Sequence, residues 1–316
     1  MELYRPIGGD WFLEGFWRIA EPYNNHWVTV NQYLSLHQDG IPDEPTYRIN
    51  KVDQVENGIY NIGYQRAIEL QTFKKMKFDY IVPSIPKHYR EYTRLRNMYQ
   101  PQAKVICQVG NSFDFPWEWT QNIMSSSKYT SIPSNKNVVF YHQEFPLDIF
   151  SFQQFRNTKV ISSFLHLFSR RKDYPLWLEM QRVWNDFTFN TYGSEGREEY
   201  LTTDQALAEA MHNSDLIVHL KEEGDGFGHV IHNAFAVGRA VVTKKEYYTG
   251  KMAFDLMEDE RTCFFWHEDK SSQWNIDRIN SFNWADIGVN AHNRFNDVVN
   301  YEKEEKDVRR FLDRST

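Results

Sequence analysis

A short Gly-rich segment in the second half of the chain carries the residues best suited to chemistry. Asp225 stands directly before Gly226-Phe227-Gly228, and Asn233 follows the second glycine by five residues. The two glycines allow a tight turn and a close approach of the backbone to a ligand. A helix that begins near Gly228 points N–H groups and a partial positive charge at this turn, a favourable site for a diphosphate. Asp225 and Asn233 could then accept hydrogen bonds from hydroxyl groups of the same ligand.

The wider segment has an ordered pattern of small and apolar residues. After Asn233 come Ala234-Phe235-Ala236, then Gly238, then Ala240-Val241-Val242. This pattern resembles the donor-binding segment of nucleotide-sugar glycosyltransferases of the two-domain GT-B fold, in the families with two acids eight positions apart. Asn233 and Ala240 replace the Glu and Pro that are usual there. The alternative is an ordinary strand–turn–helix corner with Asp225 as a solvated cap.

The resemblance implies roles for further residues of the second half. The similar families place an Arg and a Lys after the first strand of this domain to neutralise the donor diphosphate, and Arg170, Arg171 and Lys172 stand there. Tighter spacing than usual leaves open which of the three contacts phosphate, and a solvated basic turn is the alternative. Tyr192 stacks on the nucleoside base or lies in the core. His229 touches the sugar or phosphate, or faces solvent.

The first half of the chain should supply the acceptor site and a base. Candidates at the ends of expected strands are Asp114 and His142, with Glu144 close by. An inverting reaction needs a base to take the proton of the acceptor hydroxyl. A retaining reaction, usual in the families with two acids, uses the departing phosphate instead, and the sequence does not decide between the two.

A basic run lies between residues 74 and 104, with eight Lys or Arg residues and two acidic residues. Lys87, Arg90 and Arg94 share one face of an expected helix, and aromatic side chains share another face. Such a face could bind a phosphate backbone, meet anionic lipid head groups, or be solvated. By analogy with phage-type transferases of this fold, the acceptor could be a hydroxymethylated pyrimidine in DNA.

The composition indicates a folded protein of the cytoplasm. A net charge of -7 argues against a generally basic nucleic-acid-binding protein. Cys107 and Cys263 lie in apolar runs and are expected to be buried thiols in a reducing compartment. No apolar run has the length of a membrane span or a signal peptide. The chain lacks a His-Glu-x-x-His pattern, a Cys cluster and the Asp-x-Asp motif, so we expect no metal and no cofactor besides the nucleotide-sugar co-substrate.

The order of expected elements predicts an α/β fold. Apolar runs predict strands at 2–6, 27–33, 80–83, 104–109, 138–141, 160–168, 187–192, 216–220, 240–243 and 262–266. Helices are expected at 60–75, 87–99, from 173, from 202 to about 213, from 228 and from 289 to about 314, with a loop at 125–136. Thr202 and Gln205 form a possible capping box.

Alternating strands and helices imply parallel sheets covered on both faces. The resemblance implies the GT-B arrangement, in which two Rossmann-like domains face a cleft. We expect an N-terminal acceptor domain at 1–157, a donor-nucleotide domain at 158–288 and a C-terminal helix at 289–316 that packs back on the first domain.

The resulting hypothesis is a hexosyl or pentosyl transferase that uses a nucleoside diphosphate donor and a DNA or glycan acceptor. Two other classes stay open: a non-catalytic module that binds sugar nucleotides, and a sugar-nucleotide epimerase that converts the donor without an acceptor.

Overall fold

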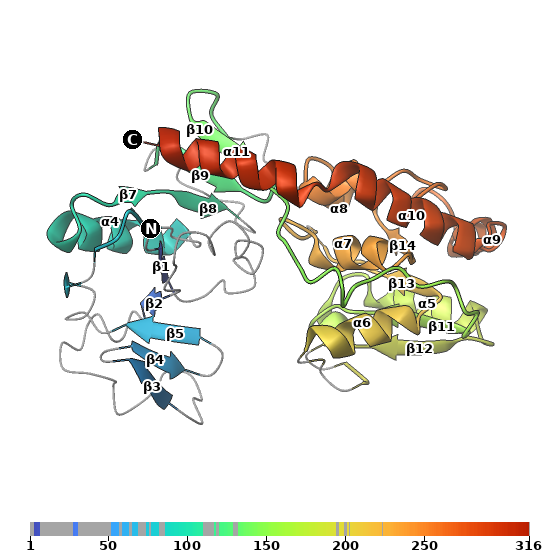
Figure 1. Ribbon diagram of the computed structural model, residues 1–316. Coiled ribbons are helices and arrows are strands. Elements are labelled where there is room, and N and C mark those ends of the chain that lie inside the picture. The colour runs from blue at the N-terminus through green and yellow to red at the C-terminus, as the bar shows by residue number, and fades with distance from the viewer. Residues whose placement is uncertain are drawn as a thin grey trace. The chain divides into compact units, whose positions relative to one another are not determined.

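The computed structural model of the chain (Figure 1) describes most residues of the second half and shorter stretches of the first. The described residues are 3–6, 28–30, 52–56, 59–62, 65–68, 74–75, 77–81, 86–109, 117, 120–128, 132–193, 196–198, 201, 203–222 and 224–315. Side chains are described within these ranges from residue 74 onward, with the exception of 86–92.

The chain divides into two compact units. Unit 1 comprises Met1–Glu144 together with Tyr301–Thr316, and unit 2 comprises Phe145–Asn300. None of the helices in the part of the chain that the structure describes is long and apolar enough to cross a membrane.

Unit 1 contains a seven-stranded sheet in the order β3-β4-β5-β2-β1-β6-β7. Its strands are β1 (Leu3–Pro6), β2 (Val28–Val30), β3 (Val52–Glu56), β4 (Ile59–Ile62), β5 (Gln65–Ile68), β6 (Tyr80–Ile81) and β7 (Lys104–Val105). The pairs β5–β2, β2–β1, β1–β6 and β6–β7 are parallel, whereas β3–β4 and β4–β5 are antiparallel. The helix α4 (Pro86–Tyr99) confirms the helix predicted at 87–99.

The helix predicted at 60–75 is wrong. Residues 60–62 and 65–68 of this segment lie in β4 and β5, which pair with Ile62 opposite Gln65, while β3 pairs with β4. Residues 57 and 58, between β3 and β4, are Asn-Gly, the dipeptide most typical of a two-residue hairpin connection. Local turn chemistry therefore outweighs the weak helical spacing of apolar residues that suggested a helix.

A second sheet of unit 1 is built from three parallel strands. They are β8 (Cys107–Val109), β9 (Asn122–Ser125) and β10 (Asn137–Phe140), in the order β10-β9-β8. The sequence analysis missed β9, so the loop predicted at 125–136 begins one residue later. The helix α11 (Tyr301–Arg314) packs on β10, and its Val308, Phe311 and Leu312 share a core cluster with Met124 and Val139.

Unit 2 has a five-stranded, wholly parallel sheet in the order β12-β11-β13-β14-β15. The strands are β11 (Val160–Ser163), β12 (Thr188–Thr191), β13 (Leu216–Val218), β14 (Ala240–Thr243) and β15 (Phe264–Phe265). Every residue of β13 and β14 is buried, as expected for strands with both faces covered. All five strands match the strands predicted in this half.

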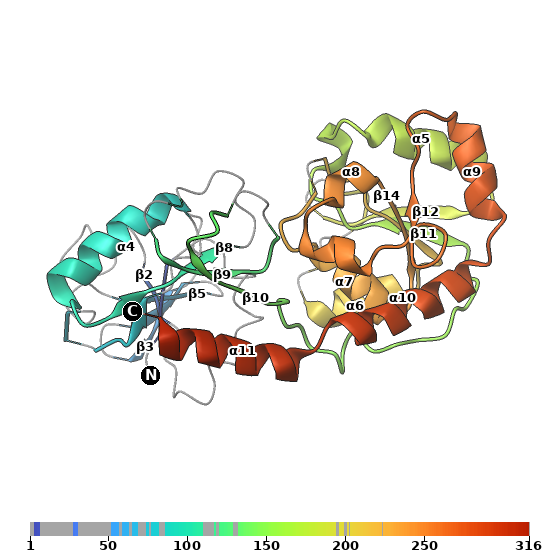
Figure 2. The ribbon, with the colours of Figure 1, turned by 90° about the horizontal axis from the view of Figure 1, so that it is seen from above.

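Helices cover both faces of this sheet. Figure 2 shows α5 (Tyr174–Val183) and α9 (Ser272–Asn280) on one side and α6 (Asp204–His212), α7 (His229–Ala236) and α10 (Trp284–Val298) on the other. The core includes Trp177, Met180, Leu216, Val242 and Ile276, each at most 1% exposed. The short α8 (Lys245–Tyr248) follows β14.

Two local predictions about helices differ from the structure. The helix expected from 289 to 314 is two helices, because the backbone is extended at Val299, between α10 and α11. The N-cap of α6 is Thr203, whose hydroxyl accepts a hydrogen bond from Ala206 N at 3.2 Å, and not Thr202. Both cysteine side chains are buried, as predicted.

Candidate functional site

The polar residues of unit 2 gather at the carboxyl edge of its parallel sheet. His166 comes shortly after β11, Tyr192 directly after β12, His219 directly after β13 and Lys244 directly after β14. Because parallel strands all end at the same edge, these residues share one side of the unit. Ligands of open α/β sheets bind beyond this edge.

Asp225 contacts His219 of this edge, and its partners His219, Lys221 and Tyr248 make up the group around Asp225. Its carboxylate accepts a hydrogen bond from His219 Nε2 at 2.9 Å and one from Tyr248 Oη at 3.3 Å, and it forms an ion pair with Lys221. Burial opposes ionisation of Asp225, but the hydrogen bonds and charges of His219 and Lys221 outweigh it. They hold the pKa of this carboxyl well below its usual range, so Asp225 is ionised at neutral pH.

The turn after Asp225 leads into α7 through a glycine that no other residue could replace without strain. Gly228 is the N-cap of α7 with φ of +93°, and a Cβ there would lie 2.8 Å from the Cβ of Ala253. Phe227 is buried and stacks on His232 of α7 with ring centroids 3.9 Å apart, and this contact fixes the turn against the helix. The first N–H groups of α7 are therefore presented at the turn beside Asp225.

Two side chains of α7 retain unused hydrogen-bonding capacity. Asn233 is 5% exposed, and its Oδ1 has no partner among the described residues. His229 Nε2 likewise has none there. Burial lowers the pKa of His229 to about 4, against the opposing charge of Asp225 and with a smaller contribution from the charge of Lys221. Buried polar groups are normally paired, so both atoms are candidates for contact with a ligand.

Among the three basic residues after β11, the structure distinguishes one. Arg170 and Lys172 are exposed, whereas Arg171 is half-buried and its Nε has no partner in the described part of the chain. Burial, followed by the charges of Lys221 and Arg171, lowers the pKa of His166. The charges of Arg171, Lys221 and Asp225 therefore all act on His166.

A buried network holds the basic turn in place. Asp173, the N-cap residue of α5, accepts hydrogen bonds from Lys244 Nζ at 2.8 Å and from Tyr247 Oη at 2.5 Å. Lys244 also pairs with Glu268. Burial opposes the charge of Lys244, but its two carboxylate partners raise its pKa above the usual range. The turn at 168–172 is therefore fastened to the end of β14.

Tyr192 is partly exposed at the end of β12. Its ring stacks on Phe164 with centroids 5.1 Å apart, and its hydroxyl accepts a hydrogen bond from Asn190 Nδ2 at 3.3 Å. Burial raises the pKa of this phenol. One face of the ring is thus occupied by the protein.

The candidates of unit 1 are less completely described. His142 is 6% exposed, and its backbone N and ring Nδ1 lie 2.7 Å and 2.6 Å from the carboxylate oxygens of Glu304 on α11. Arg94 on α4 is exposed and its guanidinium contacts Met98 Sδ at 3.3 Å. Asp114 and the side chains of Lys87 and Arg90 lie outside the described residues.

The sequence analysis missed His166, His219, Lys221 and Tyr248. The first two carried a signal, because each closely follows a buried strand, where parallel topology exposes side chains to a ligand. Lys221 stands four residues before Asp225, so this nearby cation could also have been recognised in the sequence. Tyr248 approaches from α8 through the tertiary fold and had no local signal.

The group around Asp225 is suited to an anion. The charge of Asp225 is balanced by Lys221, while Arg171 and the N-terminus of α7 add positive potential. The lowered pKa values of His166 and His229 keep these imidazoles neutral at pH 7, so each can both donate and accept a hydrogen bond. Among the described residues, no three His, Cys, Asp or Glu side chains could together hold a metal ion.

The lowered pKa of His229 makes stability depend on pH. Between its ordinary value of 6.5 and about 4, the unfolded chain binds a proton at His229 that the folded chain does not. The free energy of unfolding should therefore fall as the pH falls through this window. The variant His229→Gln should show a shallower loss between pH 6.5 and 4.5 in urea unfolding than the parent protein. Identical slopes for His229→Gln and the parent protein would contradict the assignment.

Comparisons with known proteins show similarity in structure and not in sequence. No family model matches the chain, and no curated protein matches it. The structure of Anabaena Alr3699/HepE in complex with UDP and glucose is similar with a TM-score of 0.66, at 14% identity over 99% of both chains. A glycosyltransferase from Rickettsia africae has a TM-score of 0.66 at 11% identity, over 100% of this chain and 99% of that one.

A third similar structure is an alpha-glucosyltransferase in complex with UDP and a 13-mer DNA, with a TM-score of 0.65 at 9% identity over 99% of both chains. Similarity at such low identity establishes architecture and not activity. The α/β sheets of this chain and these matches along its length show that it has the GT-B fold.

Proposed function

We propose that the chain transfers a sugar, a hexose or a pentose, from a nucleoside diphosphate donor to an acceptor hydroxyl. The observation that carries this proposal is the group around Asp225, where an ionised carboxylate pairs with Lys221, accepts a hydrogen bond from His219 and precedes a helix N-terminus at the carboxyl edge of a parallel sheet. Similar structures are complexes with UDP and glucose or with UDP-glucose, which supports the same class of donor.

Different residues of unit 2 bind different parts of the proposed donor. Asp225 accepts hydrogen bonds from the sugar hydroxyls, and Asn233 from the ribose. Arg171 and the N-terminus of α7 at Gly228 hold the diphosphate, which His229 also contacts. Tyr192 offers the free part of its ring to the base. Arg171 Nε, His229 Nε2 and Asn233 Oδ1 have no partner among the described residues, which supports their roles.

The chemistry requires that the bond between the anomeric carbon and the phosphate oxygen breaks as a bond to the acceptor oxygen forms. Negative charge grows on the departing diphosphate, and Arg171, Lys221 and the helix end stabilise that charge. The proton of the acceptor hydroxyl passes to a base. For this base we propose His142 or Asp114, and the departing phosphate if the anomeric configuration is retained.

Replacing Asp225 tests the donor site. Asp225→Asn keeps the size of the side chain but removes the charge that pairs with Lys221, and we expect transfer to fall by about 100-fold or more. The measurement is the rate of nucleoside diphosphate release with donor and acceptor present. Glu222→Gln, an exposed acid on the same loop, is the matched control and should keep its rate. Unchanged transfer in Asp225→Asn would remove this residue from the reaction.

Replacing the basic residues tests which of them contacts phosphate. Arg171→Gln should weaken donor binding by about 10- to 100-fold, the range expected for a lost hydrogen bond to a charged group. Lys172→Gln, which removes an exposed charge one residue away, should leave binding within about 3-fold. Calorimetric titration with UDP and UDP-sugars measures both. Equal losses in the two variants would favour a diffuse basic surface over a specific contact.

For the acceptor we propose a hydroxymethylated pyrimidine in DNA. The basic helix α4, with Lys87, Arg90 and Arg94, supports a phosphate backbone as ligand, and one similar structure is a complex with UDP and DNA. A glycan acceptor is the second candidate, because a pocket of unit 2 has polar and apolar groups suited to a neutral sugar.

Mass spectrometry separates these acceptors and the other functional classes. We expect a mass gain of one sugar on hydroxymethylpyrimidine DNA and none on plain DNA, with the gain lost in the triple variant Lys87→Gln/Arg90→Gln/Arg94→Gln. A gain on oligosaccharides alone would establish the glycan acceptor. Donor binding without transfer would indicate a binding module, and conversion of the donor without any acceptor an epimerase.

A further inference from the structure

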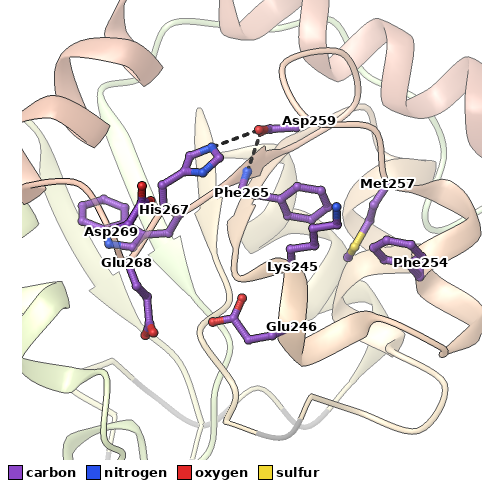
Figure 3. Close-up of a pocket in the computed structure, with 10 residues that line it drawn as sticks. Lys245, Glu246, Phe254, Met257, Asp259, Phe265, His267, Glu268 and Asp269 are labelled. Atoms are coloured by element: carbon purple, nitrogen blue, oxygen red, sulfur yellow. Dashed lines mark hydrogen bonds and ion pairs between the residues drawn. The ribbon is translucent and has the colours of Figure 1, made fainter.

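A pocket of about 690 Å³ lies beside the ends of β14 and β15 in unit 2 (Figure 3). Its size falls within the range of small-molecule sites. Residues from α8, from the segment before β15 and from the segment after β15 line it. None of them belongs to the donor site proposed above.

The lining joins an apolar wall to a polar rim. Phe254, Met257 and Phe265 form the wall, with the Phe254 and Phe265 rings nearly parallel at 6.3 Å between centroids. Glu268 and Asp269 lie on the opposite side in Figure 3. A sugar ring has an apolar C–H face and an edge of hydroxyl groups, so it could satisfy both parts of such a lining at once.

The charges of the rim are almost balanced by fixed partners. Of its four carboxylates, Asp259 pairs with Arg278, Glu268 with Lys244 and Asp269 with Lys270. The fourth, Glu246, stands next to Lys245, which also lines the pocket. The ion pairs leave lone pairs on the carboxylate oxygens free to accept hydrogen bonds from hydroxyl groups. Phosphate is disfavoured by four carboxylates, and a cation would meet three carboxylates that already have partners.

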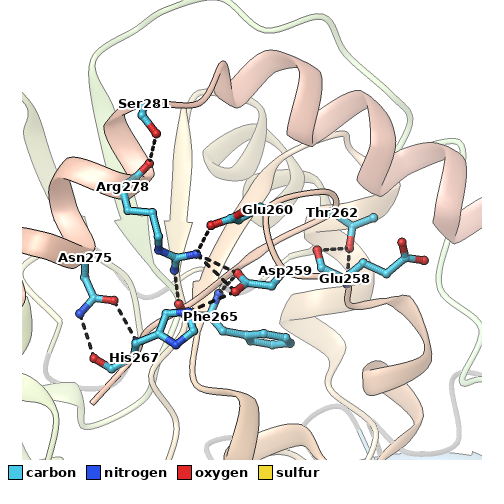
Figure 4. A network of polar contacts seen from close by, with 9 residues as sticks. All are labelled: Glu258, Asp259, Glu260, Thr262, Phe265, His267, Asn275, Arg278 and Ser281. Carbon is cyan, nitrogen blue, oxygen red and sulfur yellow. Dashed lines mark hydrogen bonds and ion pairs between the residues drawn. The ribbon is translucent and has the colours of Figure 1, made fainter. Parts of the chain in front are cut away.

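A network of hydrogen bonds and ion pairs holds the polar side of the pocket (Figure 4). Asp259 accepts hydrogen bonds from Phe265 N at 2.8 Å and from Arg278, and lies 3.2 Å from His267 Nε2. Asn275 bonds both the N and the O of His267, each at 2.9 Å. Side chains held in this way lose little conformational entropy when a ligand binds. A low entropy cost favours a ligand that binds through many weak hydrogen bonds.

From this combination we infer that the pocket is a binding site for a neutral saccharide. This site is additional to the donor site and does not depend on it. If the acceptor is a glycan, the pocket holds part of that acceptor; if the acceptor is DNA, the pocket binds a saccharide as a separate ligand.

The test is saturation-transfer NMR followed by calorimetry, with a panel of neutral gluco-, galacto-, manno- and N-acetylglucosamine oligosaccharides and no nucleotide. We expect at least one of them to bind the full chain. Glu246→Ala and Phe254→Ala should each weaken that binding by about 10-fold, the loss of one good contact, while Glu222→Ala should not change it. Glu246 is exposed and its replacement should leave the fold intact, which covers the case in which Phe254→Ala unfolds.

UDP binding is measured on the same samples, so that the two proposals fail separately. Loss of saccharide binding with unchanged UDP binding in Glu246→Ala would support the pocket. If no neutral saccharide binds, if the variants bind as well as the parent chain, or if a Lys-rich peptide binds there and saccharides do not, the inference is overturned. None of these outcomes depends on whether UDP binds.

Discussion

The parallel pairing of β11 to β15 is the constraint on which the candidate site depends. Strands β13 and β14 are buried along their whole length, and this burial requires helices on both faces of the sheet. Each connection must then cross back over the sheet before the next parallel strand begins. All five strands therefore end at one edge. Residues distant in sequence, such as His166 and His219, reach this edge as a result of the parallel strand order alone.

Charged side chains buried in unit 2 have hydrogen-bond or ion-pair partners. Asp225 has three partners, and Asp173 has two. Arg239 is 1% exposed and donates to the carbonyl oxygens of residues 153, 212, 237 and 238, which ties the segment before β11 to the ends of α6 and α7. A buried cation with four carbonyl partners costs less than an unpaired one, and it fixes the geometry of the segments it joins. The turn from Asp225 to Gly228 leads into α7 and therefore adjoins segments that have little conformational freedom.

The sequence predicted unit 2 far better than unit 1, for a physical reason. Its strands are continuous apolar runs separated by helices, so the pattern changes clearly from one element to the next. The region 52–68 is a meander of short strands in which apolar residues are too few to show an alternation, and the Asn-Gly at 57–58 was the informative signal.

At the site, the turn from Asp225 to Gly228 was visible because local chemistry requires it. Tyr248 and the pairing of Lys244 with Asp173, 71 residues apart in the chain, arise from tertiary packing and leave no local trace. The relative importance of Arg170, Arg171 and Lys172 was equally invisible, because it rests on which side chain the fold buries.

Unit 1 consists of two separate segments of the chain, which affects the order in which the units can fold during synthesis. Its core cluster includes Val308, Phe311 and Leu312 of α11, and the hydroxyl of Tyr80 donates to the carbonyl of Leu312 at 2.9 Å. A ribosome releases these residues after the whole of unit 2, which is contiguous in the chain. Unit 2 can thus close its core while the nascent chain is still growing, whereas unit 1, although it begins first, must wait with an uncovered apolar surface. Chaperone binding during synthesis should therefore concentrate on the N-terminal segment.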